Sequence, residues 1–199
     1  MRGLAPALLA FIVVVLAGCR TLPPAAPVAG PTLVGLDWPA RRAALQGREQ
    51  FDLNGRVAVA AGNEGFNGHL RWSQRGTLCT LDLEGPLGVG GVHVVSDGAR
   101  LDLTNAAGQQ LDSAAARDEL LRRLGFEPPL EHLRYWVQGV PDPALPASET
   151  PDAVQRLSAL EQDGWSITYL AYEDPPGGLP RRLNLVRGDV RVRMVIDNW

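Results

Sequence analysis

Cys19 has the most distinctive chemical surroundings of any residue in the sequence. It follows Ala17-Gly18 and an unbroken apolar run from Leu8 to Leu16, which itself comes after Arg2. A basic start, an apolar segment and small residues before a cleavage site are typical of a secretory signal peptide. The run is too short to span a bilayer, which takes about 20 apolar residues. We therefore expect cleavage directly before Cys19.

The residues Leu16-Ala17-Gly18-Cys19 resemble a bacterial lipobox. In that class of signals the cysteine sulfur receives a diacylglycerol, the chain is cut before the cysteine, and the new amine is acylated. Two or more acyl chains give stable membrane anchoring, whereas one binds only marginally. Many lipoproteins kept in the inner membrane carry Asp at the next position, so Arg20 favours the outer membrane. The alternative is an ordinary cleaved signal that happens to be followed by cysteine.

The other reactive residue types show no catalytic arrangement. The sequence has no Gly-x-Ser-x-Gly elbow, no P-loop and no dinucleotide fingerprint. His69, His93 and His132 lack metal-ligand spacing, and Asp118-Glu119 are neighbours that do not share a helix face. Cys79 alternates with leucines and is predicted to be a small core residue. We expect no catalytic residue, no metal site and no cofactor.

An unusual turn is predicted from Glu84 to Gly91. Pro86 and Gly88 are ordinary turn formers, but Leu87 stands between them. A single loop leucine usually folds back onto the core. If Leu87 instead projects outward, its burial in a membrane is worth about 1.5–3 kcal/mol. That is enough to position a loop in lipid but not to anchor a protein.

Length and charge limit the class of protein. The chain has 199 residues, with 19 basic and 22 acidic side chains, which argues against a nucleic-acid partner. We predict a signal peptide at 1–18, a lipidated Cys with a Pro-rich extended tether at 19–36, and a single domain at 37–199.

Period-two alternation dominates the predicted domain. It predicts half-buried antiparallel strands at residues 51–59, 66–73, 77–84, 91–95, 100–104, 153–161, 165–172, 181–186 and 190–196. Helices are predicted at residues 38–48, 114–124 and 130–138, and a Pro-rich loop at 139–153.

About nine or ten strands therefore surround two central helices. A sheet this long tends to curl, and an apolar concave face needs a filled core or a cover. The helices placed between the two groups of strands would be that cover. The prediction is a mainly β fold, an unclosed antiparallel β-barrel (half-barrel) with an α-helical lid over an apolar cavity.

Short motifs of a known family occur along nearly the whole predicted mature chain. They are Leu53-Asn54-Gly55-Arg56, Leu70-Arg71-Trp72-Ser73-Gln74, Gly85-Pro86-Leu87-Gly88, Leu133-Arg134-Tyr135-Trp136-Val137-Gln138-Gly139-Val140-Pro141, Gly164-Trp165, Leu179-Pro180 and Asp197-Asn198-Trp199. In order and spacing, together with the lipobox, they resemble the LolB family of outer-membrane lipoprotein receptors.

The resemblance implies a specific function. LolB-like proteins accept an acylated lipoprotein from the periplasmic carrier LolA and place it in the inner leaflet of the outer membrane, without nucleotide hydrolysis. The implied partners are a LolA-like carrier, lipoprotein cargo and outer-membrane phospholipid, and we expect a monomer. Leu87 falls on the exposed loop leucine of the family, so Pro86, Leu87 and Gly88 become the expected membrane-insertion loop.

Strand alternation also predicts the lining of the cavity. The tryptophans among these residues suit either a core or a wall for acyl chains, and a register error of one residue would invert the assignment of a strand. The predicted acyl-chain cavity consists of Val57, Leu70, Trp72, Leu81, Leu83, Leu133, Trp136, Trp165, Ile167 and Met194.

Two other functions stay open at this point. A scaffold lipoprotein that binds peptidoglycan or another envelope protein needs no cavity. An enzyme of envelope lipids or glycans needs a nucleophile with a base, or a pair of carboxylates, and the sequence offers neither pattern.

Overall fold

The computed structural model describes residues 33–86, 90–174 and 178–199. Within these ranges, the helices are α1 (Trp38–Gln46), α2 (Ser113–Leu124) and α3 (Leu130–Trp136). The strands are β1 (Gln50–Ala61), β2 (Glu64–Arg75), β3 (Leu78–Glu84), β4 (Val92–Ser96), β5 (Leu101–Asn105), β6 (Gln110–Leu111), β7 (Ala147–Pro151), β8 (Leu157–Gln162), β9 (Trp165–Tyr172), β10 (Pro180–Arg187) and β11 (Val190–Asn198).

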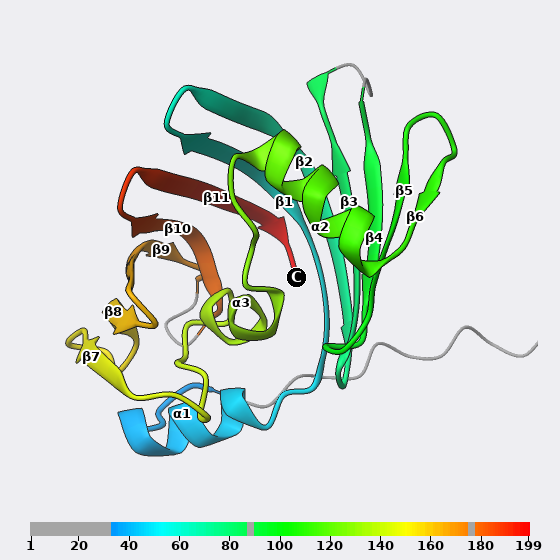
Figure 1. Cartoon of the computed structure of the whole chain (residues 1–199). Helices are drawn as coiled ribbons and strands as arrows, with labels where there is room; N and C mark the ends of the chain where they lie inside the picture. The colour runs from blue at the N-terminus through cyan, green and yellow to red at the C-terminus, as the bar shows by residue number, and fades with distance from the viewer. Residues whose placement is uncertain (1–32, 87–89, 175–177) are drawn as a thin grey trace, which may run out of the picture.

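These strands form one antiparallel sheet in the order β6-β5-β4-β3-β2-β1-β11-β10-β9-β8-β7. The chain enters at the middle of the sheet, runs to one edge, crosses through α2 and α3, and returns from the opposite edge to pair β11 with β1. The sheet curves around the two crossing helices, and its edges β6 and β7 lie apart (Figure 1). The predicted half-barrel with a helical lid is confirmed.

The alternation of buried and exposed residues determines which side chains lie on the inner face of the sheet. Along β1 every second residue is buried, from Phe51 to Ala61. Pairing places Val57 opposite Met194 on β11, and Leu70 on β2 opposite Leu83 on β3. Because cross-strand partners share a face, the apolar residues of neighbouring strands form one continuous inner surface. Among the described residues, no helix has the length and apolar character needed to cross a membrane.

Some predicted boundaries were wrong. The segment predicted as a loop at 139–153 contains β7, whose residues are mostly polar and exposed because they form a sheet edge. The strand predicted to begin at residue 153 begins at Leu157. Before it, the carboxylate of Asp152 accepts hydrogen bonds from the backbone N–H groups of Val154 and Arg156, both at 2.9 Å. This turn has Gln155 at φ 61°. The two-residue strand β6 was not predicted.

Helix α1 seals one end of the curved sheet. Asp37 caps it, since its Oδ1 accepts from the N–H of Ala40 at 2.9 Å. Leu45 is completely buried and packs in a small second core with Val140 and Leu179. Leu33 joins this cluster, although it falls within the predicted tether. The proposed boundaries after residues 18 and 36 stay predictions.

Replacing Gly55 with alanine should destabilise the fold. An added Cβ would lie 2.3 Å from the backbone oxygen of Val195, at a register shift between β1 and β11. We expect a loss of about 1–3 kcal/mol in the free energy of unfolding, measured by urea denaturation. Gly65→Ala is the control, because its Cβ would meet the oxygen of Val59 at an ordinary 3.5 Å. Equal stability of the two variants would contradict the close approach.

Candidate functional site

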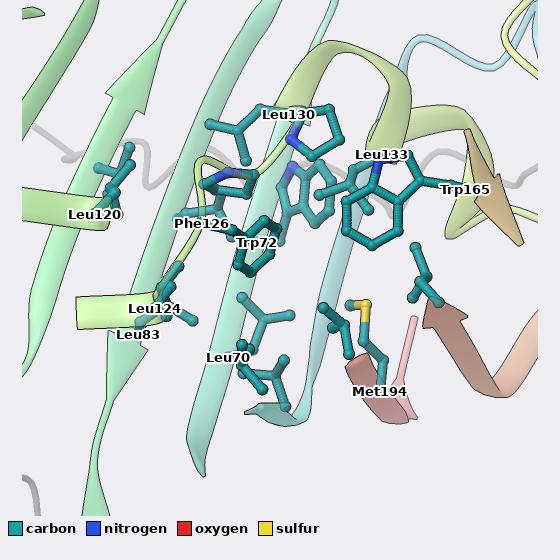
Figure 2. Close-up of a pocket in the computed structure, with 18 residues that line it drawn as sticks. Leu70, Trp72, Leu83, Leu120, Leu124, Phe126, Leu130, Leu133, Trp165 and Met194 are labelled. Carbon is teal, nitrogen blue, oxygen red and sulfur yellow. The ribbon is translucent and has the colours of Figure 1, made fainter. Parts of the chain in front are cut away.

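An apolar pocket lies between the inner face of the sheet and the helical segment that crosses it (Figure 2). Every residue that lines it has an apolar side chain, although two of them are tryptophans with a ring N–H. Its volume is about 70 Å³. The lining residues are Val57, Val59, Leu70, Trp72, Leu81, Leu83, Val94, Leu120, Leu124, Phe126, Pro128, Pro129, Leu130, Leu133, Trp165, Leu185, Val192 and Met194.

The register of the central strands brings the floor of the pocket together. Trp72 on β2 is opposite Leu81 on β3, Val57 on β1 is opposite Met194 on β11, and Val192 on β11 is opposite Leu185 on β10. These side chains point to the same side of the sheet because cross-strand partners share a face. The floor therefore spans β3, β2, β1, β11 and β10.

The cover comes from α2 and the segment that follows it. Leu120 and Leu124 are buried on the inner side of α2. Phe126 follows and lies with its ring centroid 5.7 Å from that of Trp165. Most of this cover was missing from the predicted cavity. The leucine stripe of α2 was visible in the sequence, but the apolar residues between the helices had no periodic signal.

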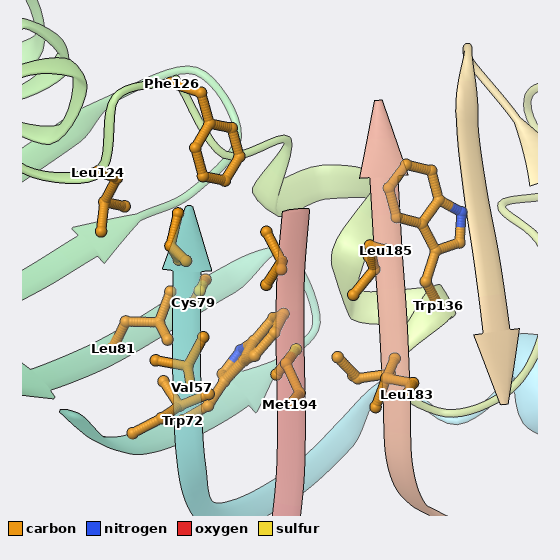
Figure 3. Close-up of a cluster of buried hydrophobic side chains, with 14 of the residues drawn as sticks. Val57, Trp72, Cys79, Leu81, Leu124, Phe126, Trp136, Leu183, Leu185 and Met194 are labelled. Atoms are coloured by element: carbon orange, nitrogen blue, oxygen red, sulfur yellow. The ribbon is translucent and has the colours of Figure 1, made fainter. Parts of the chain in front are cut away.

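Eight of the ten residues predicted for the cavity line this pocket: Val57, Leu70, Trp72, Leu81, Leu83, Leu133, Trp165 and Met194. Trp136 and Ile167 do not. Both are completely buried, and Figure 3 shows Trp136 well away from Trp72. The hydroxyl of Tyr169 on β9 donates to the backbone oxygen of Trp136 at 2.9 Å. Alternation assigns Ile167 to the inner face correctly, but it cannot say which part of that face is filled by packing.

Gln162 fixes α3 to the sheet. Its Oε1 accepts from Trp136 Nε1 at 2.7 Å and from the N–H of Asp142 at 2.9 Å. Its Nε2 donates to the backbone oxygens of Asp142 at 2.9 Å and Leu145 at 3.1 Å. Gln162 is only 3% exposed, and buried hydrogen bonds of this kind are costly to break. The end of α3 is therefore held rigidly against β8.

Helix α2 is attached at both ends: at its start Ser113 Oγ accepts from the backbone N–H of Leu101 at 3.0 Å, and near its end Arg123 reaches the neighbouring loop. Arg123 donates through Nη1 to the backbone oxygen of Gly90 and pairs through Nη2 with Glu119 at 3.0 Å. Gly90 lies in the connection between β3 and β4. The neighbouring Arg122 also binds Glu119, but its side chain is 69% exposed. One arginine thus joins the cover of the pocket to the β3–β4 connection.

Of the two tryptophan ring N–H groups near the pocket, one has a hydrogen-bond partner and the other has none among the described residues. Trp72 Nε1 donates to Gln74 Oε1 at 3.0 Å. Trp165 Nε1 is buried and has no hydrogen-bond partner among the described residues. A buried donor without a partner costs about 1–3 kcal/mol, so Trp165 carries an unused hydrogen-bonding capacity beside the pocket.

The titratable residues form no catalytic cluster within the described ranges. His93 Nδ1 lies 2.7 Å from Asp82, and His132 Nδ1 lies 2.7 Å from Asp142. No group of three His, Cys, Asp or Glu residues is placed to hold a metal ion in the part of the chain that the structure covers. Cys79 is buried, as predicted, and burial raises the pKa of its thiol to about 12. It is therefore a protonated core residue at neutral pH.

The predicted membrane loop and lipidation site are only partly visible. Pro86 is exposed at the end of β3. Leu87, Gly88 and Cys19 lie outside the described residues, so their roles stay predictions.

Comparison with known proteins places this architecture in a family. A family model described as "Outer membrane lipoprotein LolB" matches residues 49–199. An outer-membrane lipoprotein LolB of Nitrosococcus oceani is 37% identical over 188 residues, which cover 94% of this chain and 92% of that protein. Another from Stutzerimonas stutzeri is 34% identical and covers 94% and 91%.

The chain belongs to the LolB family. Its function is therefore that of an outer-membrane lipoprotein receptor that takes up lipoproteins and inserts them into that membrane. The scaffold alternative is not favoured. Within this LolB protein, the pocket under α2 is the candidate site for the lipid part of the cargo.

Arg123→Gln should loosen the cover. Loss of the charged hydrogen bond to Gly90 is expected to favour opening of α2 by about 1 kcal/mol, or roughly five-fold faster amide exchange in α2. Hydrogen–deuterium exchange followed by mass spectrometry measures this. Arg122→Gln is the matched control, since it removes a pair with Glu119 but no contact to Gly90. Equal exchange in both variants would exclude the proposed attachment.

Proposed function

We propose that the pocket under α2 receives the acyl chains of lipoproteins that a LolA-like carrier delivers. The observation that carries this proposal is the uniformly apolar set of side chains around the pocket. Acyl chains offer no hydrogen-bonding groups along their length, so an apolar wall of the right shape is what they require.

Acyl chains need more room than the pocket has. Its volume is about 70 Å³, whereas pockets for small ligands usually have about 300–1,000 Å³. The receptor must therefore open before it binds. Helix α2 is the part that moves, because Gln162 holds α3 while α2 is attached outside by Arg123. Gly125, at φ 77°, ends α2 and forms a hinge there.

Transfer then requires only a gradient of affinity. Each CH₂ group withdrawn from water is worth about 0.8 kcal/mol, so acyl chains do not pass through water unaided. The receptor must bind them more tightly than the carrier and less tightly than the bilayer. No bond is made or broken, so the transfer needs no catalytic group. One copy of the chain supplies the whole pocket, which supports a monomer.

The membrane contacts belong to the same proposal. Cys19, acylated, would hold the domain at the outer membrane through the tether that follows it. Pro86, Leu87 and Gly88 would contact phospholipid, since Pro86 is exposed and the loop follows directly from β3, whose Leu83 lines the pocket. Cargo would thus leave the pocket next to the loop that touches the bilayer.

Leu130→Glu should impair acyl binding. Leu130 lines the pocket and is half-buried, so a carboxylate there puts charge next to the apolar chains. The lost leucine contact alone is worth about 1.5–3 kcal/mol, which corresponds to at least a ten-fold loss in affinity for an apolar fluorescent probe, measured by titration. Leu121→Glu is the control, because Leu121 is 51% exposed on α2. A saturable site of unchanged affinity in the Leu130 variant would refute the proposed location.

Leu87→Glu should separate acceptance from delivery. The pocket stays intact, so the acylated receptor in vesicles should still take labelled lipoprotein from the carrier. Delivery to the bilayer should fall about ten-fold, since a leucine contact worth about 1.5–3 kcal/mol is replaced by a charge. The control is Leu78→Glu, an exposed leucine at the opposite end of β3. Normal delivery by the Leu87 variant would contradict a role of Leu87 in membrane insertion.

A further inference from the structure

Two arginines on the outer face of the sheet have only uncharged residues directly opposite them on the neighbouring strands. Arg191 and Arg193 are alternate residues of β11, both exposed, so they point to the same side, about 6–7 Å apart along the strand. Opposite charges commonly face each other across strands, but here no acid does so. The cross-strand neighbours of the two arginines are Ala58, Ala60, Asn184 and Val186.

A hollow of about 370 Å³ opens beside Arg193 on this outer face. Its base is formed by small or apolar residues, and Arg56 and Arg193 supply its guanidinium groups. The short side chains of the central strands leave this space, because Ala58 and Gly68 lie between longer ones. The residues around it are Arg56, Val57, Ala58, Asn67, Gly68, His69, Pro86, Arg193 and Val195.

The acids near this face pair with other arginines and leave Arg191 and Arg193 without a counter-ion among the described residues. Arg56 pairs with Asp197 at 2.8 Å. Arg191 and Arg193 have no ion pair with any described residue. The chain as a whole has a net charge of −3, so a general excess of arginine does not explain the unpaired cations. They lie where an anion can approach from outside.

We propose that this hollow and the adjacent arginines bind the phosphate groups of membrane phospholipids. Guanidinium groups form paired hydrogen bonds with phosphate oxygens, and the apolar base of the hollow suits the glyceride part of the same molecule. A lipid headgroup matches this combination of a cationic rim and an apolar base better than an acidic protein surface does.

The position of the hollow supports a membrane as the source of the phosphate. Pro86 lines it and begins the loop proposed to contact phospholipid. The pairing of His69 with Glu84 places the end of β3 beside this part of β2. The β1–β2 and β10–β11 hairpins extend toward the same side of the molecule as the end of β3 (Figure 1). The headgroup site thus adds a contact with the membrane that is separate from acyl-chain binding in the pocket.

Photo-crosslinking tests the site with the full acylated protein. The protein is reconstituted into phosphatidylethanolamine vesicles, with or without phosphatidylglycerol, that contain a phospholipid with a photoreactive headgroup. Cross-linked peptides are mapped by mass spectrometry. We expect cross-links at residues 56–69 and 182–195 that increase with phosphatidylglycerol and decrease at high salt, since salt screens exposed charges.

Arg193→Gln should lower these cross-links about five-fold, since one basic residue near an anionic membrane surface is worth about that factor in affinity. Arg193→Lys should retain most of them. Arg100→Gln is the matched control, because Arg100 is an exposed arginine of the β4–β5 turn and its loss should change nothing. All these residues are on the surface, so thermal unfolding should be the same in the variants.

Unchanged cross-linking in Arg193→Gln, or an even distribution over the domain, would overturn the proposal. Normal cross-linking with impaired uptake from the carrier would also overturn it, in favour of an acidic protein partner at this face. Binding of an apolar probe in the acyl pocket is measured separately. A failure of the headgroup site is therefore distinguishable from a failure of the proposed function.

Discussion

The inner face of the curved sheet is mostly apolar, and it must be kept from water. This constraint explains the arrangement of the other elements. The sheet curves but does not close, so its own strands cannot shield the inner surface. The helices that connect the two edges lie within the curve and supply the missing apolar contacts. The cover is therefore part of the core, and any opening of it exposes apolar surface unless a ligand replaces the cover.

The two covering helices differ in how firmly they are held. Buried hydrogen bonds to Gln162 fix the end of α3, whereas α2 packs through Leu120 and Leu124 and is joined to the β3–β4 connection by Arg123. Apolar contacts have no strict geometry, so leucines that pack on the sheet can also pack on acyl chains. The acyl chains of the cargo can then replace the sheet as the packing partner of α2. The polar network, in contrast, preserves the rest of the fold during exchange.

Much of the architecture could be predicted from the sequence, because a sheet with one buried face has a strong period of two. That period located β1 and most other strands, and it assigned to the inner face the seven strand residues of the predicted cavity that line the pocket. The period of two is absent where a segment does not have one buried face and one exposed face. The edge strand β7 is largely exposed, so its sequence does not alternate clearly. Ile167 lies on the inner face but outside the pocket, because alternation identifies a face but not how the helices divide it. Trp136 lies on α3, where a period of two carries no information. The apolar residues between α2 and α3, namely Phe126, Pro128 and Pro129, belong to no helix or strand and gave no periodic signal.

The order of the strands also has a consequence for biogenesis. The first strand to be made, β1, is central in the sheet, and its partner β11 comes from the opposite end of the described chain. The strands β2 to β6 pair only with sequence neighbours, so the half of the sheet from β1 to β6 can assemble while the chain is still emerging from the translocation channel. The seam between β1 and β11 cannot form until everything between them has been exported. Until then one edge of β1 stays unpaired, and the nascent receptor itself needs protection from aggregation in the periplasm.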